Sequence, residues 1–181
     1  MNEQHKKRIG KFLSLVLRHE PQKIGIELDE NGWADVSELI VKCARKNIRF
    51  NMKELEEIVV TNDKKRYSFN EDKTKIRANQ GHSINIDLGL TPVEPPEFLF
   101  HGTAERSYAS IMEDGIKRVS RQHVHLSKDK ETAHKVGSRH GRPIILTILS
   151  GQMYRDGFEF FVSENGVWLT DYVEAKYISV S

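Results

Sequence analysis

Hydrophobic positions near the N-terminus recur with the spacing of an amphipathic helix. They fall at i, i+3, i+4, i+7 and i+8, at Ile9, Phe12, Leu13, Val16 and Leu17. Pro21 disfavours helical geometry at the residue before it, so we expect this helix to end near Arg18 and His19. Both cationic residues would then lie at the helix C-terminus, where the helix dipole favours positive charge.

The next apolar patterns predict a strand, two helices and a hairpin. Alternation of apolar and polar residues over 24–28 is typical of a short half-buried strand. Asp35 and Asn51 are each followed three residues later by glutamate, which is the pattern of a capping box at a helix start. Two short apolar segments around a polar turn predict a β-hairpin over residues 67–78. The order helix, strand, helix, helix, hairpin is that of a winged helix.

The predicted hairpin is rich in cationic residues, which are Lys64, Lys65, Arg66, Lys73, Lys75 and Arg77. A solvated charged surface and a contact with nucleic acid would both produce this pattern, and the sequence does not choose between them.

Proline residues mark the best boundary between two halves of the chain. Pro92, Pro95 and Pro96 lie among acidic residues over 91–97, which predicts a stiff, extended connector.

The second half of the chain opens on a segment of three apolar residues followed by a histidine, a glycine and a threonine. Phe98 to Phe100 are bulky, and we expect a short strand buried on both faces. His101, Gly102 and Thr103 follow, and the glycine would let the backbone approach a ligand closely.

The remaining pattern predicts short strands and two helices, and hence an α+β fold for the whole chain. One helix runs to Gly115, and the strand 121–127 after it would place His123 and His125 on one face. A second helix runs to Gly137. The later strands are expected at 144–149, at 158–162 and 167–169 as a hairpin around Asn165-Gly166, and at 177–180.

Composition limits the classes of protein that remain. The chain has 38% hydrophobic and 30% charged residues and a net charge of +2, as a water-soluble domain would. No apolar run is long enough to span a membrane, so we expect no membrane association. Cys43 is the only cysteine and cannot form an internal disulfide, so we expect a cytoplasmic protein.

Several common chemistries lack their motifs. There is no glycine-rich dinucleotide motif, no phosphate-binding loop and no nucleophile elbow. His123 and His125 could chelate a metal, but a single cysteine leaves the ligand set incomplete, so we expect no metal. What remains is arginine and histidine at the predicted loop ends, and several converging arginines would suit a multiply charged phosphate.

Six blocks of sequence, in order along the chain, resemble the RNA 2′-phosphotransferase family, whose members use NAD to remove a 2′-phosphate from RNA, including spliced tRNA. The blocks are Leu15–His19, Ile76–Ser83, Phe100–Thr103, Arg121–Ser127, Arg139–Gly141 and Asn165–Thr170. The resemblance implies a winged-helix RNA-binding lobe at 1–90, the linker 91–97, and an ADP-ribosyltransferase-like split β-sandwich lobe that binds NAD at 98–181.

The resemblance also implies roles for individual residues. The family's Arg-His-Arg-Arg tetrad falls on Arg18, His19, Arg77 and Arg121. The NAD pocket would be lined by His101, Gly102, Thr103, His125 and Ser127. His19 could donate a proton or bind phosphate as a cation, and the sequence does not decide between these roles.

The reaction that the resemblance implies has two steps. An internal RNA 2′-phosphate first displaces nicotinamide from NAD, which is consumed as a co-substrate. The ribose 2″-hydroxyl then attacks that phosphate, which frees RNA with a 2′-hydroxyl and forms ADP-ribose 1″,2″-cyclic phosphate. We expect a monomer that binds RNA and NAD and that needs no metal.

Two other functions compete with this interpretation. An ADP-ribosyltransferase that modifies a terminal nucleic-acid phosphate or a protein would share the NAD lobe and differ in its acceptor. A non-catalytic winged-helix module would bind nucleic acid in a salt-dependent way without consuming NAD.

Overall fold

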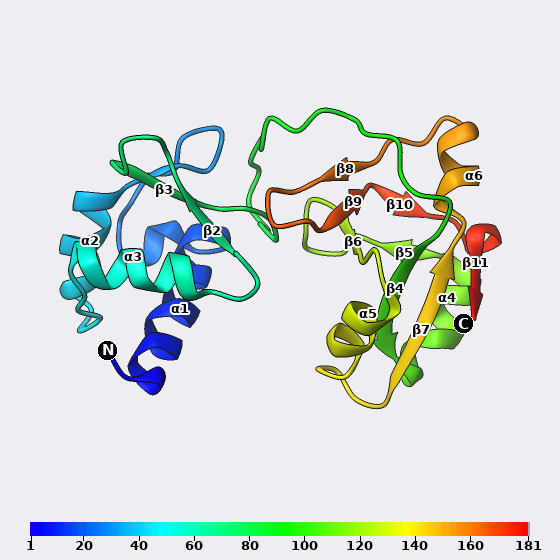
Figure 1. Cartoon of the computed structure of the whole chain (residues 1–181), viewed down its shortest axis with the longest axis horizontal. Helices are drawn as coiled ribbons and strands as arrows, with labels where there is room; N and C mark the ends of the chain where they lie inside the picture. The colour runs from blue at the N-terminus through cyan, green and yellow to red at the C-terminus, as the bar shows by residue number, and fades with distance from the viewer. Residues whose placement is uncertain (181) are drawn as a thin grey trace. The chain divides into compact units, whose positions relative to one another are not determined.

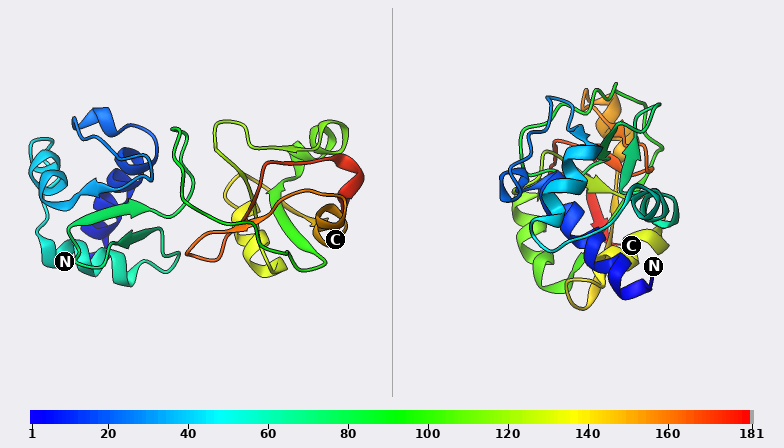
Figure 2. Two further views of the ribbon diagram at one scale, coloured as in Figure 1. Left: turned by 90° about the horizontal axis from the view of Figure 1, so that it is seen from above. Right: turned by 90° about the vertical axis from the view of Figure 1, so that its left-hand side faces the viewer.

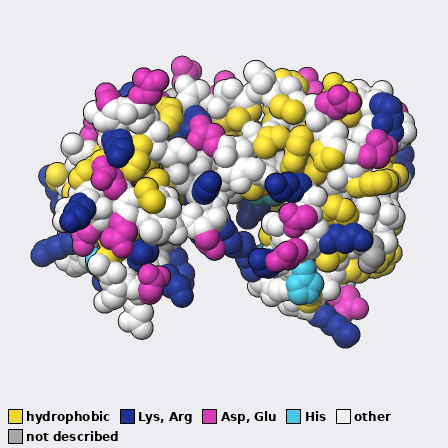
Figure 3. Space-filling view, in the orientation of Figure 1, with side chains coloured by type: hydrophobic (Ala, Val, Ile, Leu, Met, Phe, Trp, Pro, Cys, Tyr) yellow, Lys and Arg dark blue, Asp and Glu magenta, His cyan; other side chains and the backbone are white. Residues whose placement is uncertain are grey.

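The chain divides into two compact units in a computed structural model that describes residues 1–180. Unit 1 is Met1–Gly89 and unit 2 is Leu90–Ser181, and each is described by itself below (Figure 1, Figure 2, Figure 3). Residue 181, the last of the predicted 98–181 lobe, lies outside the described residues. None of the described helices has the length and apolar character needed to cross a membrane.

Unit 1 combines three helices with one small sheet. Its helical elements are α1 (Glu3–Arg18), the 3-10 turn η1 (Pro21–Lys23), α2 (Val36–Ala44) and α3 (Met52–Thr61). Its strands are β1 (Ala34–Asp35), β2 (Tyr67–Phe69) and β3 (Lys75–Ala78), which form an antiparallel sheet in the order β1-β3-β2.

The local signals for the helices of unit 1 are confirmed. Helix α1 ends at Arg18, with His19 as its C-cap, and buries Ile9, Leu13, Val16 and Leu17 in the core. The side chain of Asp35 accepts a hydrogen bond from the Glu38 N–H at the start of α2. At the start of α3 both bonds of a capping box are present between Asn51 and Glu54.

The predicted strand at 24–28 is wrong. Ile24 and Ile26 both donate backbone hydrogen bonds to the Pro21 carbonyl, so this segment turns on itself rather than pairing with a neighbour. Gly25 between them has a φ of 72°, which interrupts extended backbone. The alternation arises because both isoleucines still reach the core, and the strand that precedes α2 is β1 instead.

Unit 2 contains short strands and three short helices. Its helical elements are η2 (Glu105–Ser107), α4 (Tyr108–Asp114), α5 (Lys130–Gly137), α6 (Ser150–Arg155) and η3 (Ala175–Tyr177). Its strands are β4 (Leu99–Ala104), β5 (Ile116–Lys117), β6 (Val124–Leu126), β7 (Pro143–Ile148), β8 (Phe161–Val162), β9 (Trp168–Thr170), β10 (Tyr172–Val173) and β11 (Ile178–Val180).

The strands of unit 2 pair in antiparallel fashion, in the orders β11-β7-β4, β6-β9-β8 and β10-β5. Phe100 and Ser127 form an isolated bridge with backbone bonds of 2.8 and 2.7 Å, which joins the first sheet to the second. The α+β class is therefore confirmed, whereas the winged-helix and split β-sandwich architectures stay predictions.

Several element predictions for unit 2 need correction. Phe98 lies outside β4 and is 49% exposed, so the expected strand buried on both faces is wrong there. His101, Gly102 and Thr103 do not form a tip but continue β4. His123 precedes β6, so the expected shared strand face with His125 is wrong, and its ring packs instead on Phe161 at 5.7 Å between centroids.

Gly102 is required by the packing of helix α5 on strand β4 (Figures 1 and 2). A Cβ at Gly102 would lie 1.6 Å from the Ala133 carbonyl oxygen and 3.0 Å from the Gly137 nitrogen. A Cβ at Gly137 would in turn lie 2.9 Å from the Thr103 carbonyl oxygen. The side-chain position of Gly102 is therefore occupied by the backbone of α5 rather than open to a ligand.

Candidate functional site

In unit 1, the C-terminus of helix α1 is tied to the loop that follows strand β3. The Ser83 N–H donates a hydrogen bond of 3.0 Å to the Arg18 carbonyl. The Ser83 hydroxyl and the His19 Nδ1 lie 2.8 Å apart and are hydrogen bonded. These two bonds place the ends of two separate elements, and the cations they carry, in one cluster.

Gly81 leaves room for the guanidinium of Arg18. A Cβ at Gly81 would lie 3.4 Å from the Arg18 Cζ, and its φ of +88° is one that residues with a side chain rarely adopt. The loop backbone at 79–83 can therefore turn directly beside the cation.

Arg77 is held by an aromatic ring. Its guanidinium carbon lies 4.6 Å from the centroid of the Trp33 ring, within the range of a cation–π interaction. Trp33 is only half-buried, and its ring lies beneath Arg77. The Trp33 ring covers one face of the Arg77 guanidinium. The N–H groups of Arg77 therefore point outward in the plane of the guanidinium.

His82 lies at the centre of this cluster and is only 1% exposed. Among residues 1–180, neither of its ring nitrogens has a hydrogen-bond partner. Burial, followed by the positive charges of Arg18, His19 and Arg77, lowers the pKa of His82 to about 4. The imidazole is therefore neutral near pH 7, and Arg18, His19 and Arg77 lie near enough to contribute to the low pKa of His82.

We expect acid to destabilise unit 1 through His82. Its pKa of about 4 in the folded protein lies below the ordinary value of 6.5, so between these values the unfolded chain binds a proton that the folded chain does not. Stability should therefore be lost as the pH falls from about 6.5 to about 4, by up to about 1.4 kcal/mol per pH unit. An NMR titration of the His82 ring should show a midpoint near 4. A midpoint near 6.5 would contradict the buried, cation-surrounded environment.

In unit 2, three predicted residues form a second polar cluster. The His101 Nδ1 lies 3.2 Å from the His125 carbonyl oxygen, and the Arg121 Nη1 lies 3.2 Å from the His125 Nδ1. A carbonyl only accepts and a guanidinium only donates, so His101 carries its proton on Nδ1 and His125 accepts on Nδ1. Neutral His101 then has an acceptor at Nε2.

His101 is kept neutral by its surroundings. Burial is the main cause that lowers its pKa, and the nearby charge of Arg121 lowers it further, although the hydrogen bond to the His125 carbonyl opposes them. Thr103 lies two residues along β4 and so shares the strand face of His101, opposite the face on which Gly102 contacts α5. Ser127 reaches this strand through its backbone bridge to Phe100.

The predicted site residues therefore fall into two groups. Unit 1 brings together Arg18, His19 and Arg77, and unit 2 brings together His101, His125 and Arg121. Within residues 1–180, no group of three or more His, Cys, Asp or Glu side chains could hold a metal ion.

Sequence reasoning missed the central position of His82, which it had only grouped with other loop histidines. The one available signal was its place between Gly81 and Ser83, in a loop adjoining the predicted hairpin. It also missed Trp33 as the partner of Arg77, because a lone tryptophan gives no sign of which cation it meets.

Comparison with known proteins gives consistent results. A family described as "RNA 2'-phosphotransferase, Tpt1 / KptA family" matches residues 4–172. A protein of Flavobacterium johnsoniae is 64% identical over 178 residues, which are 98% of each chain. A protein of Fusobacterium nucleatum is 54% identical over 94% of this chain and 96% of its own length, and one of Acaryochloris marina is 54% identical over 97% of each. All three carry the name "Probable RNA 2'-phosphotransferase".

Proposed function

The chain belongs to the RNA 2′-phosphotransferase family, and we propose that it transfers an internal RNA 2′-phosphate to the ADP-ribose part of NAD. The products would be RNA with a 2′-hydroxyl, nicotinamide and ADP-ribose 1″,2″-cyclic phosphate. The observation that carries the proposal is the cluster of Arg18, His19 and Arg77 around one buried histidine, in a chain of this family.

The unit 1 cluster has the chemistry needed for a phosphate monoester. Two guanidinium groups offer planar forks of donors that match phosphate oxygens. The Arg77 fork is fixed by Trp33, and His19 is oriented by Ser83. His82 adds no charge of its own near pH 7, because its low pKa keeps it neutral, so the positive charge comes from the residues around it. We assign Arg18, His19 and Arg77 to the RNA 2′-phosphate.

The side chains of unit 2 fit the polar groups of NAD. A carboxamide has both N–H donors and a carbonyl acceptor, and a pyrophosphate is anionic. The cluster offers an acceptor at His101 Nε2 and the charge of Arg121. We therefore assign NAD to this cluster, with Thr103 and Ser127 beside it, and with Gly102 contributing through its packing. NAD, when bound, supplies an electrophilic ribose carbon and nicotinamide as the leaving group.

The work left to the protein is positioning and neutralisation of charge. A phosphate is already anionic at neutral pH, so its attack needs no strong general base. The arginines would bring two anionic reactants together and balance the charge that collects on the phosphoryl oxygens. In the second step, His19 would give a proton to the departing RNA 2′-oxygen, with Ser83 holding its ring through Nδ1.

The direct test is incubation of the full chain with NAD and a short RNA that carries one internal 2′-phosphate, with all products followed by mass. We expect dephosphorylated RNA, nicotinamide and the cyclic phosphate in equal amounts. Loss of phosphate without consumption of NAD would overturn the NAD assignment. Stable ADP-ribose on a terminal phosphate would favour a different ADP-ribosyltransferase, and no change in NAD or RNA would overturn the activity itself.

A further inference from the structure

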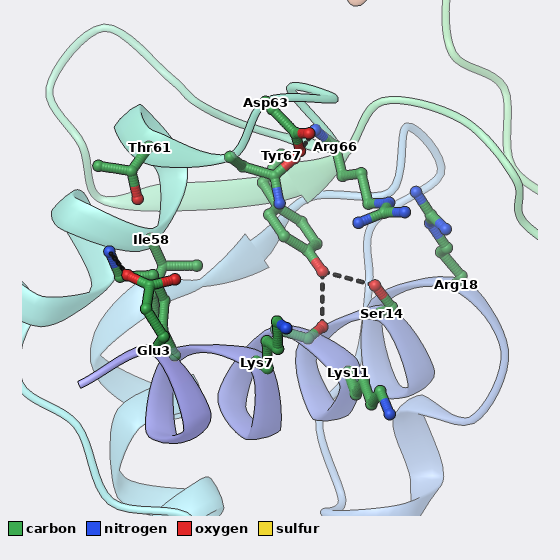
Figure 4. A pocket seen from close by; sticks show the side chains of 13 residues that line it. Glu3, Lys7, Lys11, Ser14, Arg18, Ile58, Thr61, Asp63, Arg66 and Tyr67 are labelled. Carbon is green, nitrogen blue, oxygen red and sulfur yellow. Dashed lines mark hydrogen bonds and ion pairs between the residues drawn. The ribbon is translucent and has the colours of Figure 1, made fainter. Parts of the chain in front are cut away.

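A groove on unit 1 lies between helix α1, the C-terminal end of α3 and strand β2 (Figure 4). Its volume is about 670 Å³. Ile58 is its only large aliphatic lining side chain, and the rest of the lining is mainly polar or charged. The groove is therefore suited to a charged ligand rather than to an apolar one.

The charges that line the groove are predominantly positive. Five lining residues are cationic, namely Lys6, Lys7, Lys11, Arg18 and Arg66, and two are acidic, Glu3 and Asp63. Lys6 is neutralised locally, because its Nζ lies 3.3 Å from Glu3 and 3.2 Å from Glu57. Within the described part of the chain, Lys7, Lys11 and Arg66 form no ion pair, so their charge is available to a ligand.

The positive charges are arranged along a line. Lys7, Lys11 and Arg18 are spaced by four and seven residues, which places them on one face of α1. At a rise of about 1.5 Å per residue, Lys11 and Lys7 lie about 10 and 16 Å along the helix axis from Arg18. Like charges four residues apart repel each other, and Glu3, which stands four residues before Lys7, forms its ion pair with Lys6 instead.

Arg18 belongs both to this groove and to the proposed phosphate site. Its side chain lines the groove, and it also lies beside Gly81 and His82 in the unit 1 cluster. A ligand whose phosphate is held by Arg18 can therefore extend directly toward Lys11 and Lys7. Arg66 adds a second cation near Arg18. The charges of both residues oppose the rise that burial causes in the pKa of the Tyr67 phenol, so both lie near that ring (Figure 4).

We infer that this groove binds the sugar-phosphate backbone of the RNA that flanks the 2′-phosphate. The inference rests on the proposed function, which supplies the phosphate at Arg18. A row of cations at intervals along a helix suits a strand that carries one negative charge per nucleotide. Contacts between lysine side chains and phosphates carry no sequence information, so their contribution to binding is independent of sequence.

The test compares the double variant K7A/K11A with K46A/K53A, which removes the same charge from exposed positions of unit 1 outside the groove. Binding of a 2′-phosphorylated RNA of about ten nucleotides is measured by fluorescence anisotropy over a range of salt concentrations. Each lost phosphate contact on a single strand makes the negative slope of log K against log salt shallower by about 0.7. K7A/K11A should therefore make the slope shallower by about 1.4. K46A/K53A should leave the slope within about 0.5 of wild type.

Activity gives a second measurement. K7A/K11A should raise KM for the long RNA and leave kcat unchanged, and it should not alter either constant for a dinucleotide that carries the 2′-phosphate. Equal effects of both double variants, or an equal loss on the dinucleotide, would overturn the groove as a backbone site. Unchanged RNA binding with lost affinity for an acidic peptide would overturn it in favour of a protein ligand. The anisotropy measurement is made without NAD and depends on no reaction, so a failed phosphotransferase assay would not conceal its result.

Discussion

Arg77→Ala is expected to lower turnover of the 2′-phosphorylated RNA by about 10³-fold or more, the range seen when a transition-state arginine is removed from other phosphoryl-transfer enzymes. Arg77 is assigned to the anionic phosphate, and the Trp33 ring holds its guanidinium in place. Loss of the cation–π contact should cost only about 0.5–1 kcal/mol of stability, so the variant should remain folded. Single-turnover kinetics with NAD and the short RNA measure the effect.

Two control variants separate charge from geometry at this position. Lys75→Ala removes the same charge from an exposed position two residues earlier on β3, and it should retain nearly full activity. Arg77→Lys keeps the charge but loses the planar fork, so it should recover only part of the lost rate. Activity of a folded Arg77→Ala protein within tenfold of wild type would contradict the assignment of Arg77.

Gly102→Ala is expected to destabilise unit 2 by at least about 3 kcal/mol, toward the upper end of the cost of overpacking. The added Cβ would lie 1.6 Å from the Ala133 carbonyl oxygen, and backbone of a packed helix cannot move aside as a flexible side chain can. For a unit of this size, we expect the unfolding midpoint to fall by roughly 10 °C or more. Thermal unfolding followed by circular dichroism measures this shift.

Gly10→Ala is the matched control for this substitution. Gly10 lies inside helix α1, and a Cβ there would meet nothing within 4 Å. The change should therefore stabilise unit 1 by about 0.5–1 kcal/mol through helix propensity. If Gly102→Ala left the melting temperature of unit 2 unchanged, the direct contact between β4 and α5 would be wrong.

Features governed by neighbours in sequence were predicted well. The end of α1 near Arg18 followed from Pro21, and the start of α3 followed from the pair Asn51 and Glu54, since both effects act within one helical turn. The family was predicted from six short blocks and is confirmed over residues 4–172.

Features governed by contacts between distant segments were not predicted. At Gly102 we expected close approach of a ligand, but the structure shows a packing requirement set by α5, which begins 28 residues later at Lys130. The burial of His82 depends on the ends of α1 and β3 together, and a histidine in a polar loop gives no sign of it. The isoleucines at 24 and 26 face the core from a turn, so alternation alone suggested the wrong element.

The candidate site was predicted residue by residue but not as geometry. Sequence placed Arg18 and His19 in one block and Arg77 in another, with no information on the distance between the two blocks. The structure supplies the hydrogen bond from His19 to Ser83 and the ring beneath Arg77. The sequence did not decide whether the cationic residues of the hairpin form a solvated surface or contact nucleic acid. The structure gives these residues different surroundings. Lys73 forms an ion pair with Glu56 at 3.2 Å, whereas Arg66 lines the groove.

Tyr67 gives the groove a property that charge alone would not. Its hydroxyl donates to the Gly10 carbonyl at 2.7 Å and accepts from Ser14 at 2.5 Å, so strand β2 and helix α1 are joined beneath the groove. The floor of the groove is therefore already ordered in the folded chain. The conformational entropy of this segment is lost on folding and not on RNA binding. A pre-formed floor of this kind makes association fast and indifferent to the bases, which would let one enzyme act on many RNAs that share only a 2′-phosphate.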